Sequence, residues 1–334
     1  MRKEFEKLIV SSRVRLARNL QGVPFKPSGT DAFADLATTI KNGFPGFASV
    51  RVDQLDPSVA TALFEQHLIS REILKNKKSG MLVTREADGG KQRACVMLGE
   101  EDHARIQVIQ TGTSIMPAFE LAKSIATKIE EEHKIARDEK LGFLTSCPTN
   151  LGTAMRASVM LFLPALSLTG RINQIINELK GHKIVVRGVY GEGSEATGYM
   201  YQISNQACLG MTEDAILKKV TEITTQICTI ELNLQKELFE KNSDDLIDQV
   251  MRAFGLVTHA HKISSDEATE NLAWLKLGDC LGIIKFKPRI LDDLFFVIKP
   301  ASLSSQNERA KEILERDKLR AQKIATTLKS SRQK

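Results

Sequence analysis

The chain has 334 residues, of which 42% are hydrophobic and 26% charged, a composition typical of a folded globular protein rather than a disordered one. Lys and Arg number 47 against 41 Asp and Glu, which gives a formal net charge of +6. Nine of the basic and four of the acidic residues fall within 301–334, so the rest of the chain is nearly neutral. A short basic tail, in a chain with one Trp and three Tyr, argues against a nucleic-acid partner.

The cysteines and the apolar runs favour a cytoplasmic protein. Five scattered cysteines form no Cys-x-x-Cys pair, which is typical of reduced thiols. The first residues lack the apolar stretch of a signal peptide. The longest apolar run, 157–168, is interrupted by Pro164 and is shorter than the roughly 20 residues of a membrane-spanning helix. We therefore expect no membrane partner.

The predicted secondary structure changes along the chain. Residues 30–80 have the pattern of short helices separated by Gly and Pro. Runs of apolar and β-branched residues then predict several strands, with helices at about 117–138 and 166–180 between them. This mixture predicts an α+β fold in which helices flank a largely antiparallel sheet. The predicted strands are 81–84, 94–98, 105–110, 142–147, 157–163, 183–190 and 198–204.

A different pattern begins after Gly210. Thr212, followed by two acidic residues, predicts the start of a long helix. Apolar residues then recur at alternating steps of four and three, as in one core-facing stripe or in a self-associating coiled coil. We expect a boundary near 236, between a first domain of 9–236 and a small helical C-terminal domain of 237–334. The stripe is Ile216, Val220, Ile223, Ile227, Ile230 and Leu234, and further helices are predicted at 245–254, 264–277, 289–298 and 307–328.

Five arginine-containing segments stand out in the sequence, and several of them place arginine within or at the end of a predicted apolar strand. A buried guanidinium needs a partner, so these arginines either form separate ion pairs with acidic neighbours or converge on one polyanion such as a triphosphate. The sequence has no Walker P-loop, no protein-kinase glycine-rich loop and no dinucleotide-binding fingerprint. Spacing alone therefore indicates no common nucleotide-binding fold. The arginines are Arg13, Arg15, Arg105, Arg156 and Arg187.

The segments around these arginines resemble those of the phosphagen (guanidino) kinases, which transfer the γ-phosphoryl group of ATP to a guanidinium nitrogen. The resemblance covers about 11–231 with every block in order, and the block at 147–153 is its most specific part. The blocks are Ser12-Arg13-Val14-Arg15, Glu100-Glu101-Asp102-His103, Cys147-Pro148-Thr149-Asn150-Leu151-Gly152-Thr153, Arg156-Ala157-Ser158-Val159, and Arg187-Gly188 with Gly191-Glu192.

Within that family the chain resembles the bacterial protein-arginine kinases. The core begins near Ser11, without the helical N-terminal domain that precedes it in kinases of small guanidino substrates, and extra helices follow residue 236. Segments 67–70, 190–195 and 202–206 also resemble that branch. The resemblance implies ATP-dependent phosphorylation of arginine in proteins. The alternatives are a kinase of free arginine or another small guanidino compound, and a non-catalytic regulator that binds phosphoarginine.

The same resemblance implies the nucleotide site. The five arginines clamp the ATP phosphates, His67 contacts the nucleotide, and backbone amides of 156–160 and 187–192 complete the site. Mg²⁺ is held by phosphate oxygens and water, because no carboxylate cage is evident and no protein metal ligand is expected. The implied ATP-binding residues are Ser11, Ser12, Arg13, Val14, Arg15, His67, Arg105, Arg156, Ala157, Ser158, Val159, Met160, Arg187, Gly188, Val189, Tyr190, Gly191 and Glu192.

The acceptor guanidinium is protonated and must lose a proton as it attacks phosphorus. By resemblance, Glu101 and Glu192 orient it and one of them accepts the proton. Glu100 and Asp102 are the neighbours most easily confused with Glu101, and without the family this segment is typical of a solvated turn. Cys147 lies against the acceptor in the family, where nearby arginines favour its thiolate. A lone cysteine at a strand end is otherwise usually a small buried residue.

Three further features follow from the resemblance. Residues 191–198 resemble a loop that closes over the substrate. Gly99 stands where the family commonly has Asn, and Ala154 stands where it often has Gly. Segment 316–321 fits an Arg-Asp-x-x-Arg-Ala motif that binds phosphoarginine and regulates the enzyme, although it is also typical of a charged, solvated helix. The predicted allosteric pocket residues are Arg316, Asp317, Arg320 and Ala321.

The resemblance also implies a cellular role. Kinases of this branch act in the stress response and mark proteins for regulated proteolysis. The partners to be expected are therefore protein substrates with accessible arginines, a zinc-binding activator protein, a heat-shock repressor and a Clp-type protease. A homodimer or a larger assembly is expected as well.

Overall fold

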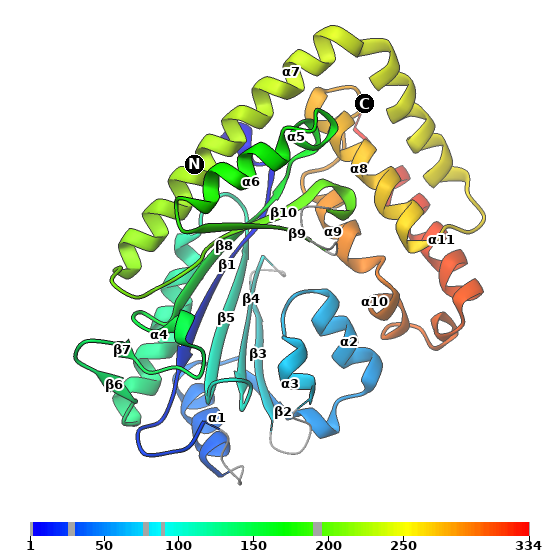
Figure 1. Ribbon diagram of the computed structural model, residues 1–334. Helices are drawn as coiled ribbons and strands as arrows, with labels where there is room; N and C mark the ends of the chain where they lie inside the picture. Colours follow the sequence, from blue (N-terminus) through cyan, green and yellow to red (C-terminus); the bar gives the residue numbers. More distant parts are fainter. Residues whose placement is uncertain (1–2, 26–30, 76–79, 88–90, 190–195, 334) are drawn as a thin grey trace.

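The computed structural model describes residues 3–25, 31–75, 80–87, 91–189 and 196–333. Its centre is an eight-stranded antiparallel sheet with the order β2-β3-β4-β5-β1-β8-β10-β9 (Figure 1). The first strand in the chain, β1, lies in the middle of the sheet and pairs with β5 and β8. The strands are β1 (Ile9–Arg18), β2 (Ala48–Arg51), β3 (Met81–Ala87), β4 (Gln92–Leu98), β5 (Ala104–Thr111), β8 (Met155–Phe162), β9 (Ile184–Gly188) and β10 (Met200–Asn205), with β6 (Arg137–Asp138) and β7 (Gly142–Phe143) in a separate ribbon.

One face of the sheet is packed under helices. Alternate residues of a strand point to the same face, and the apolar set of β1, which includes Val14 and Leu16, is fully buried there. The helices on this side include α1 (Asp31–Gly43), α4 (Met116–Glu132) and the start of α7 (Glu213–His259), which pack against the central strands and one another. This layer makes the main hydrophobic core and leaves Ser11, Arg13 and Arg15 of β1 on the opposite face.

The opposite face is covered at one edge and more open in the middle. Helices α2 (Pro57–Glu65) and α3 (Arg71–Lys75) lie beside β3 and β4 (Figure 1) and close a second apolar cluster that includes Leu82, Met97 and Ile109. Next to that cluster, over β5, β1 and β8, the side chains are polar rather than apolar. The fold therefore presents a polar strip of sheet flanked by covered regions.

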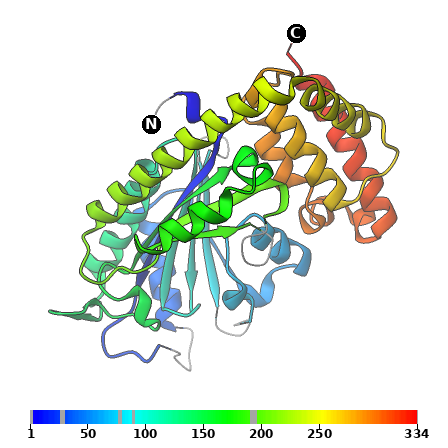
Figure 2. The ribbon, with the colours of Figure 1, turned by 45° about the horizontal axis from the view of Figure 1, so that its top comes forward.

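The last third of the chain is helical. Helix α7 runs along the sheet and continues into the C-terminal helices (Figure 2), with non-helical dihedral angles at Asn242. The boundary near 236 stays a prediction, since α7 crosses it as one element. The remaining helices are α5 (Pro164–Leu168), α6 (Ile172–Lys180), α8 (Ser265–Leu281), α9 (Ile290–Val297), α10 (Pro300–Ser304) and α11 (Ile313–Ser331).

The α+β prediction is confirmed, and several predicted segments differ in detail. No strand is predicted before residue 81, yet β1 and β2 form there. The predicted strand at 142–147 is reduced to Gly142–Phe143, and the helix predicted to reach 138 ends at Glu132. The α7 stripe is buried except for Ile230, which is 38% exposed, so its burial favours the core-facing interpretation. Among the described helices, none has both the length and the apolarity needed to cross a membrane.

Candidate active site

The strand register brings the five predicted arginines onto one face of the sheet. Arg15 of β1 lies opposite Arg156 of β8, and Ala17, two residues further on, lies opposite Arg105 of β5. Arg13 points to the same side as Arg15 because side chains two positions apart share a face. Arg187 of β9 reaches this face through the pairs Arg187–Gln202 and Gln202–Met160. The arginines come from four strands and form one row, here called the arginine row.

The arginine row is short of negative charge. Burial, with the charges of Arg105 and Arg156, lowers the pKa of Arg13 to about 10. Burial and the neighbouring arginines also lower the pKa of Arg15 well below its usual value. Within the described residues no carboxylate forms an ion pair with Arg13, Arg15 or Arg156, and the buried Nε of Arg13 has no hydrogen-bond partner. Bound anions would relieve this repulsion, so the geometry favours convergence on a polyanion over separate ion pairs.

Glu100 is the exception, because it pairs with Arg105. Its buried carboxylate accepts hydrogen bonds from Arg105 Nη1 at 2.5 Å, Ser70 Oγ at 2.6 Å and the backbone N–H of Glu101 at 2.8 Å. Burial alone would raise the pKa of Glu100, but the charge of Arg105 and these hydrogen bonds hold it below its usual value. Glu100 therefore fixes both Arg105 and the backbone of Glu101 and does not itself face a substrate.

Asp102 connects the Glu101 loop to the Cys147 loop. Its Oδ1 accepts hydrogen bonds from Asn19 Nδ2 at 2.7 Å and from the backbone N–H of Ser146 at 2.8 Å. The Asn19 side chain also accepts a hydrogen bond from the backbone N–H of His103 at 2.8 Å. The two flanking carboxylates, Glu100 and Asp102, thus serve as internal hydrogen-bond acceptors. Glu101, between them, is partly exposed, so its carboxylate is the one of the three that can contact a substrate.

A small cavity of about 150 Å³ joins these groups. Glu101 and Cys147, the predicted catalytic pair in the described chain, both line it together with three members of the arginine row. Burial and the nearby carboxylates of Asp102 and Glu100 raise the pKa of Glu101. A carboxylate with a raised pKa is a better proton acceptor than an ordinary one. The lining residues are Arg15, Leu16, Ala17, Glu101, Asp102, Arg105, Cys147, Thr149, Asn150, Ala154 and Arg156.

The other predicted ATP-binding residues divide between the two faces of the sheet. Ser158 and Met160 share the face of the arginine row, and Ser158 Oγ accepts a hydrogen bond from Gln202. Four predicted residues face the helix layer and are buried there, so any contact with a nucleotide would be through their backbone. These four are Ser12, Val14, Ala157 and Val159. Gly188 and the buried Val189 lie at the end of β9, whereas Tyr190, Gly191 and Glu192, with most of the predicted closing loop, fall outside the described residues.

His67 lies beside a second cavity of about 350 Å³ on the same face as the arginine row. The carbonyl oxygen of His67 accepts a hydrogen bond from Gln107 Nε2 at 2.7 Å, which fixes the segment after α2 against β5. Burial, with the charge of Arg13, lowers the pKa of His67 to about 3, so the imidazole is neutral. Ser11 and Met160 line the same cavity, which brings three of the predicted nucleotide contacts together.

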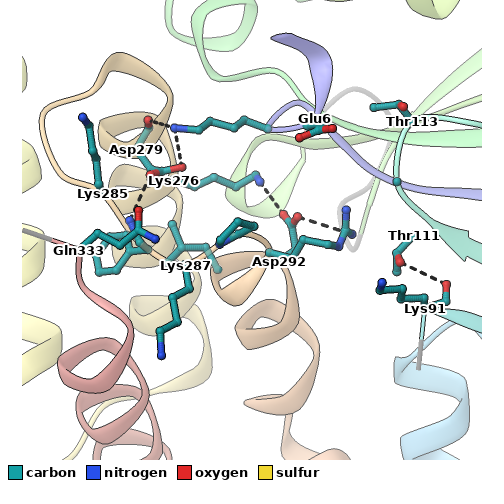
Figure 3. Close-up of a pocket in the computed structure, with 16 residues that line it drawn as sticks. Glu6, Lys91, Thr111, Thr113, Lys276, Asp279, Lys285, Lys287, Asp292 and Gln333 are labelled. Carbon is teal, nitrogen blue, oxygen red and sulfur yellow. Dashed lines mark hydrogen bonds and ion pairs between the residues drawn. The ribbon is translucent and has the colours of Figure 1, made fainter. Parts of the chain in front are cut away.

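A larger cavity of about 500 Å³ lies elsewhere, between the start of the chain and the α8–α9 connection. Figure 3 shows that its cations are paired or point apart: Lys276 meets Asp292, while Lys285 and Lys287 extend in different directions. These lysines do not converge on a point where one anion could bind. The arginine row remains the candidate phosphate site.

Two residues of the predicted phosphoarginine pocket, Arg320 and Ala321, are buried among the C-terminal helices. Arg320 is 1% exposed and donates to the carbonyl oxygens of Ile298 and Ile263 at 2.9 and 2.8 Å, and to Asp317 Oδ1. Ala321 is buried beside it. Arg320 therefore joins three segments of the C-terminal helices in this conformation, and the pocket stays a prediction.

Sequence reasoning missed the residues that hold the site together. Asn19, Gln107 and Asn205 each bond to backbone groups of neighbouring loops or strands. Asn205 Oδ1 accepts from the backbone N–H of Ala157, and its amide donates to the Met155 carbonyl. Only Asn205 directly follows a predicted strand, and a polar residue at that position did not distinguish it from others.

A family model and two solved structures identify the family and agree with the fold. Residues 30–234 match the family described as ATP:guanido phosphotransferase, C-terminal catalytic domain. The fold is similar to that of a lombricine kinase, with a TM-score of 0.57 and 23% identity over 70% of this chain and 68% of that one. It is also similar to the duplicated taurocyamine kinase of Schistosoma mansoni, with a TM-score of 0.60 and 23% identity over 75% of this chain and 38% of that one. The chain belongs to the ATP:guanido phosphotransferase family.

Two findings relate the chain to the protein-arginine kinases within this family. Residues 243–334 match the family described as the protein-arginine kinase McsB C-terminal domain. A protein-arginine kinase of Caldanaerobacter subterraneus subsp. tengcongensis is 38% identical over 96% of this chain and 97% of its own length. A protein-arginine kinase of Exiguobacterium sp. is 36% identical over 98% of this chain and 94% of its own length. One of Bacillus pumilus is 38% identical over 96% of this chain and 90% of its own length. The resemblance found in the sequence is confirmed.

Proposed function

We propose that this chain is an ATP-dependent protein-arginine kinase that uses the arginine row and Glu101. The observation that carries the proposal is the row itself. Four strands place its arginines on one face of the sheet, and Arg15, Arg105 and Arg156 line one cavity with Glu101, whose pKa is raised. The near full-length similarity to protein-arginine kinases supports a protein arginine as the acceptor.

The transfer step depends on positioning and on charge neutralisation. The arginine row binds the phosphates and stabilises the negative charge that accumulates on the leaving ADP. Glu101 accepts a proton from the acceptor guanidinium, whose nitrogen forms the new bond to the γ-phosphorus as the bond to the bridging oxygen of ADP breaks. Glu192 is proposed as the second carboxylate that orients the guanidinium, and Cys147 as a further contact beside it.

Mg²⁺ fits this arrangement as a partner of the phosphates. Among the described residues no three carboxylate, imidazole or thiol side chains come together to hold a metal ion. The charged side chains that line the cavity are three arginines and the carboxylates of Glu101 and Asp102. When bound with ATP, the ion would be held mainly by phosphate oxygens and water and would neutralise phosphate charge.

Mass spectrometry tests the proposal. The full chain is incubated with Mg-ATP and an unfolded, arginine-containing protein, and the products are digested and separated without acid because the P–N bond is acid-labile. We expect phosphoarginine in the protein. Efficient phosphorylation of free arginine with none in the protein would instead indicate a small-substrate kinase, and no transfer to either acceptor would contradict the proposal.

The remaining expectations form part of the same proposal. The phosphorylated proteins are directed to a Clp-type protease in the stress response, a heat-shock repressor is among the substrates, and a zinc-binding activator stimulates the enzyme. The enzyme works in the cytoplasm as a homodimer or larger assembly. Its regulatory domain, from about 237, binds phosphoarginine through the segment 316–321.

A further inference from the structure

The second cavity, beside His67, is built by both parts of the chain. Its catalytic-domain side includes Ser11 of β1, Ile109 of β5 and Met160 of β8. Its other side is helix α9, from which Asp293 and Phe296 line the cavity. The Phe296 ring meets the His67 imidazole edge-on, at 6.2 Å between centroids and an interplanar angle of 86°.

The position of this cavity relative to the arginine row matches the shape of a nucleotide. Ser11, Arg13 and Arg15 follow one another on the same face of β1. With a rise of about 3.4 Å per residue, Ser11 and Arg15 are about 14 Å apart, comparable to an extended nucleoside triphosphate. A ligand with its γ-phosphate between Arg15 and Glu101 therefore has its base and sugar in the second cavity.

The chemistry of the second cavity suits the uncharged end of that ligand. Its walls include apolar side chains of Ile109, Met160 and Phe296, with ionic groups of both signs at other points. His67 is neutral there, so its flat ring adds no charge. Flat apolar and aromatic walls are what a purine needs, whereas phosphates need the cations of the arginine row.

Two connections hold α9 and its neighbours against this cavity. Arg289, at the N-terminal end of α9, donates a hydrogen bond to the Val10 carbonyl of β1 at 2.5 Å and lies 3.6 Å from the buried Asp292. On the far side, the Glu65 carboxylate at the end of α2 accepts hydrogen bonds from the backbone N–H groups of Ala301 and Ser302 at the start of α10. Hydrogen bonds therefore connect the start of α9 to β1, and α10, which follows α9, to α2.

We propose that the C-terminal helical unit completes the nucleotide site, with Phe296 of α9 as a contact of the base. This inference rests on the proposed ATP-dependent activity. It makes nucleotide affinity a property of both parts of the chain, so that a shift of α9 would alter ATP binding without any change in the arginine row.

Binding of ADP and of inorganic tripolyphosphate by the full chain tests the inference, because tripolyphosphate has the phosphates and no base. We expect Phe296→Ala to weaken ADP binding about 5- to 10-fold, the lower end of the range for loss of one base–aromatic contact, and to leave tripolyphosphate binding unchanged. The matched control is Phe254→Ala, which removes another half-buried phenylalanine of the helical unit, one that lies outside this cavity. It should change neither affinity.

A second variant keeps the test decisive if Phe296→Ala folds poorly. Phe296→Trp places an indole in the cavity, and its fluorescence, corrected for Trp274 by comparison with wild type, should change with ADP and not with tripolyphosphate. Unchanged ADP affinity in Phe296→Ala, or an equal loss for both ligands, would overturn the inference and leave the proposed function intact. If wild type bound neither ligand, the proposed function would fail as well.

Discussion

Replacing Glu100 by Gln should separate the positioning of the site from its chemistry. The carboxylate of Glu100 is wholly buried and bonds to Arg105, Ser70 and the backbone of Glu101. Glutamine keeps the volume and one acceptor oxygen, but it loses the charge opposite Arg105 and turns an amide N–H₂ group toward existing donors. We expect lower stability and a lower kcat from this single change.

The size of the stability loss follows from these contacts. A hydrogen bond to a charged group contributes about 1.5–3 kcal/mol, and removal of one partner from a buried ion pair costs about 3–5 kcal/mol. Arg105 keeps 20% side-chain exposure and can regain water, so the lower range applies. We expect the free energy of unfolding to fall by about 2 kcal/mol.

The same reasoning gives a pH dependence. The folded-state pKa of Glu100 is held below its value in the unfolded chain. The resulting stabilisation is fully present above the unfolded pKa and is lost as the pH falls through the folded one. The stability difference between wild type and Glu100→Gln should therefore be constant near neutral pH and shrink below about pH 4.5, the ordinary value for glutamate.

Urea unfolding at several pH values measures this difference, and Glu72→Gln is the control. Glu72 is an exposed carboxylate that pairs with Lys75 on α3, so its replacement should leave stability unchanged. Steady-state kinetics on the same proteins should show a fall in kcat for Glu100→Gln, because Arg105 and Glu101 lose their support. Equal stability of the two variants at neutral pH would refute the positioning role of Glu100.

Four other outcomes are expected. Glu101→Gln should lower kcat by about 10²- to 10⁴-fold while ADP affinity, measured by calorimetry, stays at the wild-type value. Because the pKa of Glu101 is raised, kcat/KM should fall with decreasing pH through a pKa above 4.5, and an acid limb at or below that value would contradict the assignment. Arg156→Ala should weaken tripolyphosphate binding by at least tenfold, whereas Arg252→Ala, on the surface of α7, should not. Ala154 has φ of +51°, so Ala154→Gly should raise the free energy of unfolding by about 0.5–1 kcal/mol in urea titrations, and a loss of stability would contradict the strain argument.

The members of the arginine row could be predicted from the sequence, but their common face could not. Arg105, Arg156 and Arg187 were recognisable because arginine within or at the end of an apolar strand needs an anion. All five members were recognisable because the surrounding blocks resemble a known family. Their common face depends on the pairings of β1 with β5 and β8, which join residues about 90 and 145 positions apart. The β1 segment alternates Ser and Arg with Val and Leu, and an apolar run therefore did not reveal it as a strand.

Other functional properties depend on tertiary contacts that no local pattern specifies. Glu100, Glu101 and Asp102 are adjacent and chemically similar, and only the positions of Arg105, Asn19 and Ser146 separate two structural carboxylates from the exposed one. Arg320 likewise reads as part of a charged helix, whereas the folding of α9 and α11 buries it against backbone carbonyls. The contribution of Phe296 to the second cavity arises in the same way, because the hydrogen bond from Arg289 to the Val10 carbonyl holds the start of α9 beside β1.

The most direct test compares wild type with Glu101→Gln by mass spectrometry under non-acidic conditions, with Mg-ATP and one unfolded protein substrate. We expect phosphoarginine in the wild-type reaction and a reduction of at least 100-fold in the variant, with ADP affinity preserved. Phosphoarginine formed at the wild-type rate by Glu101→Gln would contradict the assignment of proton transfer to this carboxylate and, with it, the central claim.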